Sequence, residues 1–398
     1  MNKASRLLYK EDMKILYVVN NFYVKGNGLS ASAQRTVQYL RETGLEVKVL
    51  SGAEETSDIL PDFVLPNWKV PIFDKLVRNQ GYTFADIDRK VIQEAIDWAD
   101  IIHIEEPFLL QMEVVKMAQK SHKRLTATYH LHPENLYSSI YMRKNPFLNG
   151  PTMKLWRDSV FNKCLIIQSP TQNAKDRLVK WHFKPEIRVI SNGMLPHEGL
   201  DENSPICASD SSDGSFTIVT TGRYSVEKDQ ITLLKAMRHS KYADRIRLVF
   251  AGRGPIGDRL KAKAASLVRK GILKYEPDFG FHSLEELENI YHKSDLYIHC
   301  ATVEVEGLSC MEAIELGMVP VIATGQLTAT AQYALSEKSK FKARNARELA
   351  ERIDWWLEHD AERRTEARKY LGMGKQYDIH KSIDKLVQMY EDVMKIEV

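Results

Sequence analysis

Three glutamates, Glu304, Glu306 and Glu312, interrupt an otherwise apolar stretch of the sequence, ATVEVEGLSCMEAIELGMVPVIA at 301–323. The pattern of this stretch predicts a turn, a helix that begins near Gly307, and a buried strand. A carboxylate among apolar residues is costly unless hydrogen-bond donors are supplied to it. Hydroxyl groups of a sugar or a ribose are such donors, so the stretch is a candidate ligand-binding site.

The predicted helix gives each glutamate a different position. Glu312 lies four residues after Leu308 and off the stripe of small residues that would pack on a sheet. That stripe consists of Cys310, Ala313, Ile314 and Gly317. Glu304 precedes the helix, and Gly307 allows a ligand to approach the free backbone N–H groups. The alternative is that the first two glutamates only favour the helix dipole and that Glu312 pairs with a basic side chain.

A second candidate site contains the basic residues of TTGRYSVEKDQITLLKAM at 220–237. Arg223 and Lys228 follow a predicted strand, and ligands of α/β sheets bind at strand ends. A guanidinium and an ammonium in one loop would bind a diphosphate and stabilise it as a leaving group. The alternative is a solvated loop in which Glu227 pairs with Lys228.

A glycine-rich loop follows the first predicted strand, in NNFYVKGNGLSASAQRTVQYL at 20–40. Gly26, Gly28 and Ala31 match G-x-G-x-x-A, the dinucleotide-binding pattern. Gly26 lies too far from Asn20 for the tight turn of that motif, and the next strand ends in VLSG without an acidic residue. What remains is a helix N-terminus suited to a phosphate, or a loop whose glycines merely permit positive φ.

Short β-rich runs alternate with helical patterns in two series, which predicts parallel sheets buried on both faces. The first series lies at 14–19, 45–50, 100–104, 124–130, 164–169 and 187–191, and the second at 216–222, 246–252, 295–300 and 319–323. We expect two Rossmann-like domains separated by a polar linker. The expected boundaries are 1–198, 199–215 for the linker, 216–375, and an amphipathic C-terminal helix at 376–398.

The composition is that of an ordinary globular protein, with 43% hydrophobic and 27% charged residues. A net charge of +3 argues against a dedicated nucleic-acid-binding protein. We find neither a signal-peptide pattern nor the run of ~18 apolar residues that a membrane span needs. The four cysteines are scattered. We therefore expect a reduced, cytoplasmic protein.

Several motifs together resemble those of one enzyme family. Glu304 and Glu312, separated by seven residues with Gly307 between them, resemble the Glu-x7-Glu motif of retaining glycosyltransferases with the GT-B fold. The order of further segments is also similar, namely VISNGM (189–194), TGRYSVEK (221–228), VFAGRGP (249–255) and HKSDLYIHC (292–300). The resemblance implies an α/β protein in which two Rossmann-like domains face each other across a cleft and the C-terminal helix returns to the first domain.

The resemblance also implies roles for individual residues. Glu312 would bind the ribose of a nucleotide sugar, and Glu304 the transferred sugar. Arg223 and Lys228 would bind the diphosphate, with Gly28 facing it across the cleft. The remaining expected contacts are His130 with the donor sugar, the segment Phe279–Phe281, with Phe279 as its site residue, with the base, and Gly252, Gly307, Leu308 and Ser309 with the nucleotide sugar. His132 competes with His130 for its role.

The implied reaction is transfer of a hexose, most simply from a UDP-sugar such as UDP-glucose, with retention of anomeric configuration. No protein nucleophile is evident, so departure of the diphosphate would carry much of the catalysis. The nucleotide sugar would be a co-substrate, and we expect neither a cofactor nor an essential metal. The Asp-x-Asp at 86–88 begins a probable helix, where aspartates are expected as caps.

The acceptor is less well determined. Segments of the chain are similar to bacterial transferases that glycosylate membrane lipids such as diacylglycerol or sterols. The stretches 67–84 and 141–163 mix basic and aromatic residues, as a surface that contacts a membrane would, or as residues covering an ordinary core would. We expect action at the inner face of the membrane on a lipid or a glycolipid. The alternatives are a soluble saccharide or metabolite as acceptor, an epimerase or hydrolase of the same fold, and a catalytically silent nucleotide-sugar-binding protein.

Overall fold

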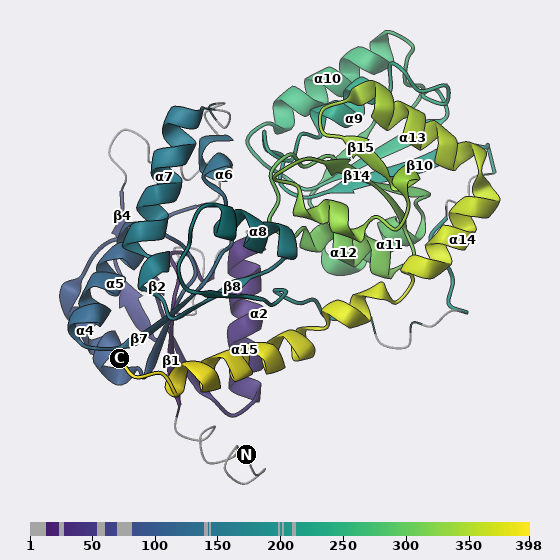
Figure 1. The fold of residues 1–398 in the computed structure, drawn as a ribbon. Helices are drawn as coiled ribbons and strands as arrows, with labels where there is room; N and C mark the ends of the chain where they lie inside the picture. The colour runs from purple at the N-terminus through teal and green to yellow at the C-terminus, as the bar shows by residue number, and fades with distance from the viewer. Residues whose placement is uncertain are drawn as a thin grey trace. The chain divides into compact units, whose positions relative to one another are not determined.

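A computed structural model describes most of the chain. It covers residues 13–23, 28–53, 60–69, 82–138, 142, 145–197, 200, 203–208 and 212–398. The chain divides into two compact units (Figure 1). The first unit comprises Met1–Pro133, Lys144–Gly193 and Ile379–Val398, and the second comprises Glu134–Arg143 and Met194–Asp378.

The first unit is built on a seven-stranded parallel sheet with the order β3-β2-β1-β6-β7-β8-β9. Its strands are β1 (Lys14–Val18), β2 (Glu46–Gly52), β3 (Phe63–Leu65), β6 (Ile101–Ile104), β7 (Arg124–Thr128), β8 (Ile166–Ser169) and β9 (Glu186–Val189). A separate antiparallel pair consists of β4 (Asn67–Trp68) and β5 (Phe84–Ala85). The helices between these strands are α2 (Gly28–Glu42), α4 (Arg89–Trp98), α5 (Leu109–Lys120), α7 (Pro146–Ser159), η1 (Phe161–Lys163) and α8 (Gln172–Lys180).

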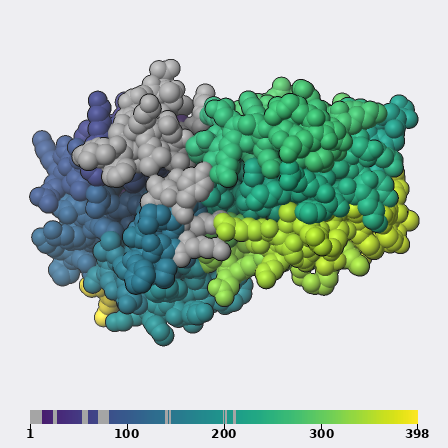
Figure 2. Space-filling model, turned by 90° about the horizontal axis from the view of Figure 1, so that it is seen from above, coloured from purple at the N-terminus to yellow at the C-terminus, as the bar shows by residue number. Residues whose placement is uncertain are grey.

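The second unit contains a six-stranded parallel sheet with the order β12-β11-β10-β13-β14-β15. Its strands are β10 (Phe216–Thr221), β11 (Ile246–Ala251), β12 (Asp278–Gly280), β13 (Leu296–His299), β14 (Val319–Thr324) and β15 (Lys340–Lys342). Its helices are α6 (Pro133–Ser138), α9 (Ile231–Ala236), α10 (Gly257–Arg269), α11 (Leu284–His292), α12 (Leu308–Glu315), η2 (Ala329–Tyr333), η3 (Glu337–Ser339), α13 (Ala346–Glu358), α14 (Asp360–Tyr370) and η4 (Met373–Tyr377). In Figure 2 the yellow-green later part of this unit lies against its teal-to-green earlier part, as expected where α13 packs on α9.

The ten strands expected from the sequence are all present, and both sheets are parallel, so the predicted fold class is confirmed. The short strands β3, β12 and β15 were not predicted. Each has three residues, and two of the three residues of β12 are Asp and Gly, which are unfavourable in strands. Their pairing with a longer neighbour therefore comes from the tertiary structure.

The last helix, α15 (Ile379–Met394), belongs to the first unit, as predicted. It lies along α2 (Figure 1) and buries Tyr390 and Met389 completely in the same apolar cluster as Ile15 of β1. Leu386 of α15 is 2% exposed. The final helix is thus part of the core of a domain whose other elements all end by Val189 of β9, 190 residues before α15 begins.

The expected linker at 199–215 is not an isolated tether where the structure describes it. Cys207 is buried in the core of the second unit, and its thiol donates to the Leu316 carbonyl at 3.0 Å. Asp213 accepts hydrogen bonds from Arg247 at 2.9 Å and from Tyr275 at 3.0 Å. The polar residues that suggest a linker instead supply partners for this unit, whose main segment is Met194–Asp378.

Two further sequence features have structural roles. Asp88 caps α4, with its carboxylate accepting from the backbone N–H groups of Lys90 and Val91, so the Asp-x-Asp segment acts as a helix start. Among the described helices, none is both long enough and apolar enough to cross a membrane.

Candidate active site

The candidate site of the second unit lies where the order of the strands in its sheet reverses. β10 is flanked by β11 on one side and β13 on the other. Loops that leave the carboxyl ends of two such strands separate and create a binding position. Arg223 and Lys228 follow β10, and Glu304 follows β13. The fold therefore brings together residues that are more than 70 positions apart.

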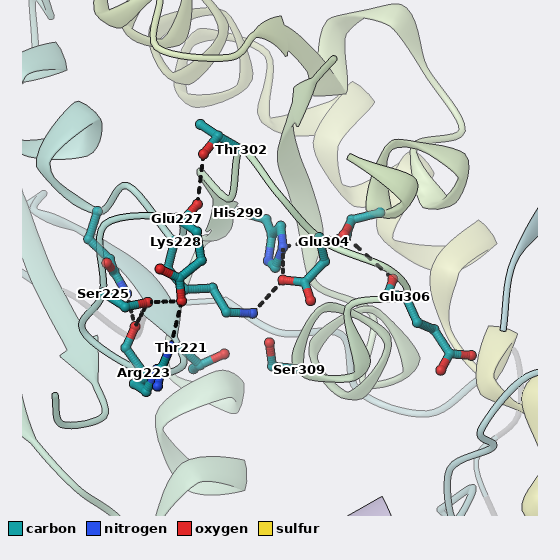
Figure 3. A network of polar contacts seen from close by, with 12 residues as sticks. Thr221, Arg223, Ser225, Glu227, Lys228, His299, Thr302, Glu304, Glu306 and Ser309 are labelled. Atoms are coloured by element: carbon teal, nitrogen blue, oxygen red, sulfur yellow. Dashed lines mark hydrogen bonds and ion pairs between the residues drawn. The ribbon is translucent and has the colours of Figure 1, made fainter. Parts of the chain in front are cut away.

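Lys228 and Glu304 form an ion pair at the centre of this site (Figure 3). The side chains are 22% and 16% exposed, so the pair is accessible but largely desolvated. The Glu304 carboxylate also lies 3.4 Å from Nε2 of His299. Burial by itself raises the pKa of Glu304, but Lys228 and His299 outweigh it and lower that pKa to about 2. Glu304 is therefore an anion at neutral pH.

Arg223 has a different partner from Lys228. Its guanidinium donates to the Glu227 carboxylate at 2.8 Å, and the Ser225 hydroxyl donates to the same oxygen at 2.5 Å. The Glu227 carbonyl accepts from the Thr302 N–H at 2.7 Å, which joins the loop after β10 to the loop after β13. The alternative expectation that Glu227 pairs with Lys228 is wrong, because Lys228 reaches the second loop instead.

The start of α12 is shaped by Gly307, as the sequence predicts. Gly307 has φ 90° and ψ 53°, and a Cβ there would lie 2.5 Å from Oγ1 of Thr330. A side chain is excluded by both the left-handed backbone and the contact. The helix begins at Leu308, so the N–H groups of Leu308 and Ser309 have no carbonyl partner within the helix. These donors follow Glu304 by four and five residues, and N–H groups at a helix start suit an anionic or hydroxyl-bearing ligand.

The other two glutamates of this stretch, Glu312 and Glu306, differ in exposure. Glu312 is half-buried, as expected for the flank of α12. Glu306 is 4% exposed, and its carboxylate points away from Lys228, Glu304 and Ser309 (Figure 3). The sequence left its role open, and the structure separates it from the Lys228–Glu304 pair.

Gly252 and Phe279, both expected at the nucleotide site, have different roles in the structure. The Gly252 N–H donates to the Gly280 carbonyl at 2.5 Å, and a Cβ on Gly252 would lie 2.1 Å from the Gly222 oxygen, so only glycine fits. The Phe279 ring stacks on that of Phe250, with centroids 4.8 Å apart. Phe279 therefore packs against the core. The exposed ring of this segment belongs to another residue, Phe281, which is 60% exposed and has the Arg253 guanidinium 4.7 Å from its centroid.

In the first unit, His130 pairs with a glutamate that the sequence analysis missed. Its Nε2 lies 2.6 Å from the Glu105 carboxylate, which is also 3.2 Å from Nε2 of His103. Burial raises the pKa of Glu105, but the two histidines outweigh it and hold that pKa below its usual range. His132 is fully buried and contacts the Tyr129 hydroxyl at 2.8 Å, whereas the His130 side chain is 8% exposed. An acidic pair directly after a buried strand was the available signal for Glu105.

Gly28 is the first residue of α2, and a Cβ there would meet nothing within 4 Å. The Ser30 hydroxyl in the same turn donates to the Asn21 carbonyl at 2.6 Å. Gly26 lies outside the described residues. Within the described ranges, no cluster of three or more His, Cys, Asp or Glu residues is placed to hold a metal ion.

Comparison with known proteins identifies the family. The family described as "Glycosyl transferases group 1" matches residues 207–372, and "Glycosyltransferase Family 4" matches residues 26–196. Alpha-monoglucosyldiacylglycerol synthase from Streptococcus pneumoniae (strain ATCC BAA-255 / R6) is 24% identical over 328 residues, covering 79% of this chain and 71% of that protein.

Two solved structures are also similar to this chain. The catalytic domain of cholesterol-alpha-glucosyltransferase from Helicobacter pylori is 41% identical in sequence, covering 41% of this chain and 99% of that chain, with a TM-score of 0.36. Anabaena Alr3699/HepE in complex with UDP and glucose is 15% identical with a TM-score of 0.66, covers 96% of this chain and 100% of its own, and shows the fold. The chain therefore belongs to the glycosyltransferases of the group 1 and family 4 type and has the GT-B fold.

Proposed function

We propose that this glycosyltransferase moves a hexose from a UDP-sugar to a membrane lipid or glycolipid, with retention of anomeric configuration. The observation that carries the proposal is the Lys228–Glu304 pair, with a helix start at Leu308, four residues after Glu304, whose first N–H groups have no carbonyl partner within α12. A cation, a carboxylate and a helix N-terminus are together the groups that a sugar diphosphate needs. The solved structure of Anabaena Alr3699/HepE with UDP and glucose supports the choice of donor.

The assigned roles follow from the charge of each group. Lys228 and Arg223 bind the diphosphate and stabilise the negative charge that grows on it as the bond to the sugar breaks. Glu304 accepts hydrogen bonds from hydroxyls of the transferred sugar, and Glu312 accepts them from the ribose. His130, held by Glu105, contacts the transferred sugar. The acceptor oxygen then bonds to the same face of the sugar that the diphosphate leaves, and the acceptor hydroxyl proton passes to the departing diphosphate.

The proposal includes independence from metal ions, because the two cations supply the charge that a divalent ion supplies in other transferases. Turnover in excess chelator should equal turnover in added Mg²⁺ or Mn²⁺. A loss of turnover that a divalent ion restores would contradict this part of the proposal.

The lipid acceptor is supported by the names of two similar proteins, one a synthase of monoglucosyldiacylglycerol and the other a glucosyltransferase of cholesterol. It is also supported by α7, which lies within the basic and aromatic stretch 141–163. On this helix Phe147 is 85% exposed and Leu155 is 54% exposed, with Lys154 exposed between them. Exposed apolar side chains beside a cation suit the interfacial region of an anionic membrane. The place of action is then the inner face of the membrane. Of the other basic and aromatic stretch, 67–84, most residues lie outside the described part of the chain.

The deciding experiment incubates the protein with UDP-, GDP- and ADP-sugars, with and without lipid extract, and measures nucleotide release and product mass. Lipid-dependent release from a UDP-sugar, with an α-linked product from an α-linked donor, is the expected result. Release that depends on a soluble saccharide would replace the lipid acceptor. An epimerised or hydrolysed sugar without acceptor, or binding without turnover, would overturn the transferase proposal for this site.

A further inference from the structure

His299, the last residue of β13, lies beside the Glu304 carboxylate and has no role among those assigned above. Its side chain is 4% exposed. Nε2 lies 3.4 Å from Glu304 Oε2 and 3.4 Å from the Thr330 hydroxyl, and Nδ1 lies 3.3 Å from the Tyr297 hydroxyl. Figure 3 shows an imidazole nitrogen directed at the Glu304 carboxylate. Such a histidine has a fixed direction and a fixed neighbour.

The surroundings keep His299 neutral and its ring in place. Burial lowers the pKa of His299, and the opposing effect of Glu304 is smaller. A neutral imidazole has one N–H donor and one acceptor nitrogen. With the proton on Nε2, the ring donates toward Glu304, and Nδ1 accepts from Tyr297. The Tyr297 hydroxyl is fixed in turn by Thr221 at 3.0 Å and Ser309 at 3.3 Å.

The need for this donor arises when the nucleotide sugar binds. The backbone of Glu304 is fixed, because its N–H donates to the Leu327 carbonyl at 2.7 Å and its carbonyl accepts from the Ala329 N–H at 3.0 Å. Its carboxylate, however, is held by the Lys228 ammonium, which the proposed function also assigns to the diphosphate. A phosphate competes with Glu304 for those N–H donors. A carboxylate that loses its cation would turn toward water unless another donor holds it.

We propose, resting on the proposed function, that His299 is a positioning residue that holds the Glu304 carboxylate in place for the transferred sugar while Lys228 binds the diphosphate. His299 does not itself touch the sugar. It makes the position of Glu304 independent of Lys228, so the pair can open without losing the sugar contact. A core histidine held only by Tyr297 and Thr330 would lack this effect.

The test compares His299→Leu with His299→Gln, whose amide N–H can replace the Nε2 donor. We measure kcat, and the dissociation constants for UDP and for UDP-glucose. His299→Leu should change the dissociation constant for UDP by no more than about twofold. It should lower kcat by about 10- to 100-fold, the usual effect of losing a charge-assisted hydrogen bond. The ratio of the affinity for UDP-glucose to the affinity for UDP should fall by a similar factor. His299→Gln should restore most of both. His239→Gln, at an exposed histidine of the same unit, is the matched control.

The Glu304→Gln variant separates the two levels of the proposal. If His299 acts through Glu304, adding His299→Leu to Glu304→Gln should cause little further loss. Normal activity of His299→Leu with impaired Glu304→Gln would overturn only the role of His299. An equal loss of UDP and UDP-glucose binding in His299→Leu would also overturn it, because it would show a general structural effect. Full activity of Glu304→Gln would instead overturn the site of the proposed function.

Discussion

At the scale of the residue, the ion pair of Lys228 with Glu304 joins two loops. The sequence predicts diphosphate binding for the first loop and sugar binding for the second. In the described structure each side chain compensates the charge of the other. A donor substrate with a diphosphate and sugar hydroxyls can satisfy both at once, which keeps the cost of opening the pair small. The pair is thus both a structural contact and the proposed ligand-binding group.

Replacing the ammonium tests this assignment. Lys228→Ala should lower kcat by about 10²- to 10³-fold, because a charge that stabilises the leaving diphosphate is removed. Steady-state kinetics with a saturating donor would measure it, and a thermal melt would check the fold. Lys235→Ala, at an exposed lysine in α9, is the control. Unchanged kcat in Lys228→Ala would refute the role of the ammonium.

The ribose assignment of Glu312 has its own test. Glu312→Ala should raise the donor KM by about 10- to 100-fold, the effect of losing a charged hydrogen-bond acceptor, with a smaller change in kcat. A donor with deoxyribose should bind more weakly than the ribose form to the natural chain and equally to the variant. Glu337→Ala, at a side chain 85% exposed, should change neither value. If Glu312→Ala still preferred the ribose donor over the deoxyribose donor as strongly as the natural chain does, Glu312 would not contact the ribose.

At the scale of the element, α12 carries a buried acid that the helical wheel did not single out. Glu315 is fully buried and accepts from the His197 N–H at 3.0 Å, while its other carboxylate oxygen has no hydrogen-bond partner among the described residues. Burial, only partly opposed by the His197 bond, raises the pKa of Glu315 from 4.5 to about 7. The group is therefore largely protonated in the folded chain at mildly acidic pH.

This shift predicts a pH dependence of stability. Between pH 4.5 and 7 the folded chain retains a proton that the unfolded chain has lost, so the free energy of unfolding contributed by Glu315 falls as pH rises and levels off above pH 7. Glu315→Gln should remove this slope and gain about 1–3 kcal/mol over the natural chain above pH 7, with little gain below pH 4.5. Urea unfolding across this range would measure it. Glu285→Gln, at an exposed site, should keep the natural slope.

The helix α7 provides the second prediction at this scale. Replacing both Phe147 and Leu155 with serine should reduce binding to vesicles that contain anionic lipid, because these two apolar side chains then no longer enter the membrane interface. Transfer to a lipid acceptor should fall as well, while donor binding should stay unchanged. Vesicle flotation and lipid-product assays would measure it. Val179→Ser, at a valine 56% exposed on α8, is the control. Unaltered flotation would exclude this face as the membrane contact.

At the scale of the whole molecule, the first unit is complete only when the last helix has been made. Leu386→Ala should destabilise the first unit by about 2–5 kcal/mol, the range for a buried leucine truncated to alanine. Hydrogen exchange should show the loss in β1 and α2, whose residues share the apolar cluster with α15. Lys385→Ala, one residue away and exposed, should have no such effect. Destabilisation confined to the second unit would contradict this packing.

Most of the fold follows from local patterns along the chain. The long strands were found because buried parallel strands are continuous in Val, Ile and Leu, and the start of α12 was found because Gly307 marks it. The boundaries were harder. The polar segment before β10 resembles a linker, yet Cys207 and Asp213 bind the second unit, and such partners are invisible in a sequence.

The sequence by itself determined that the chain has two parallel α/β domains and which residue types provide cations, carboxylates and free N–H groups. Residue type and spacing fix hydrophobic periodicity and helix starts, so these features are local. Only the tertiary structure decided which groups meet: Lys228 with Glu304 and not with Glu227, His130 with Glu105, and His299 with Glu304. These contacts join residues from different strand ends, and the order of strands in the sheet, which no local pattern encodes, brings those ends together.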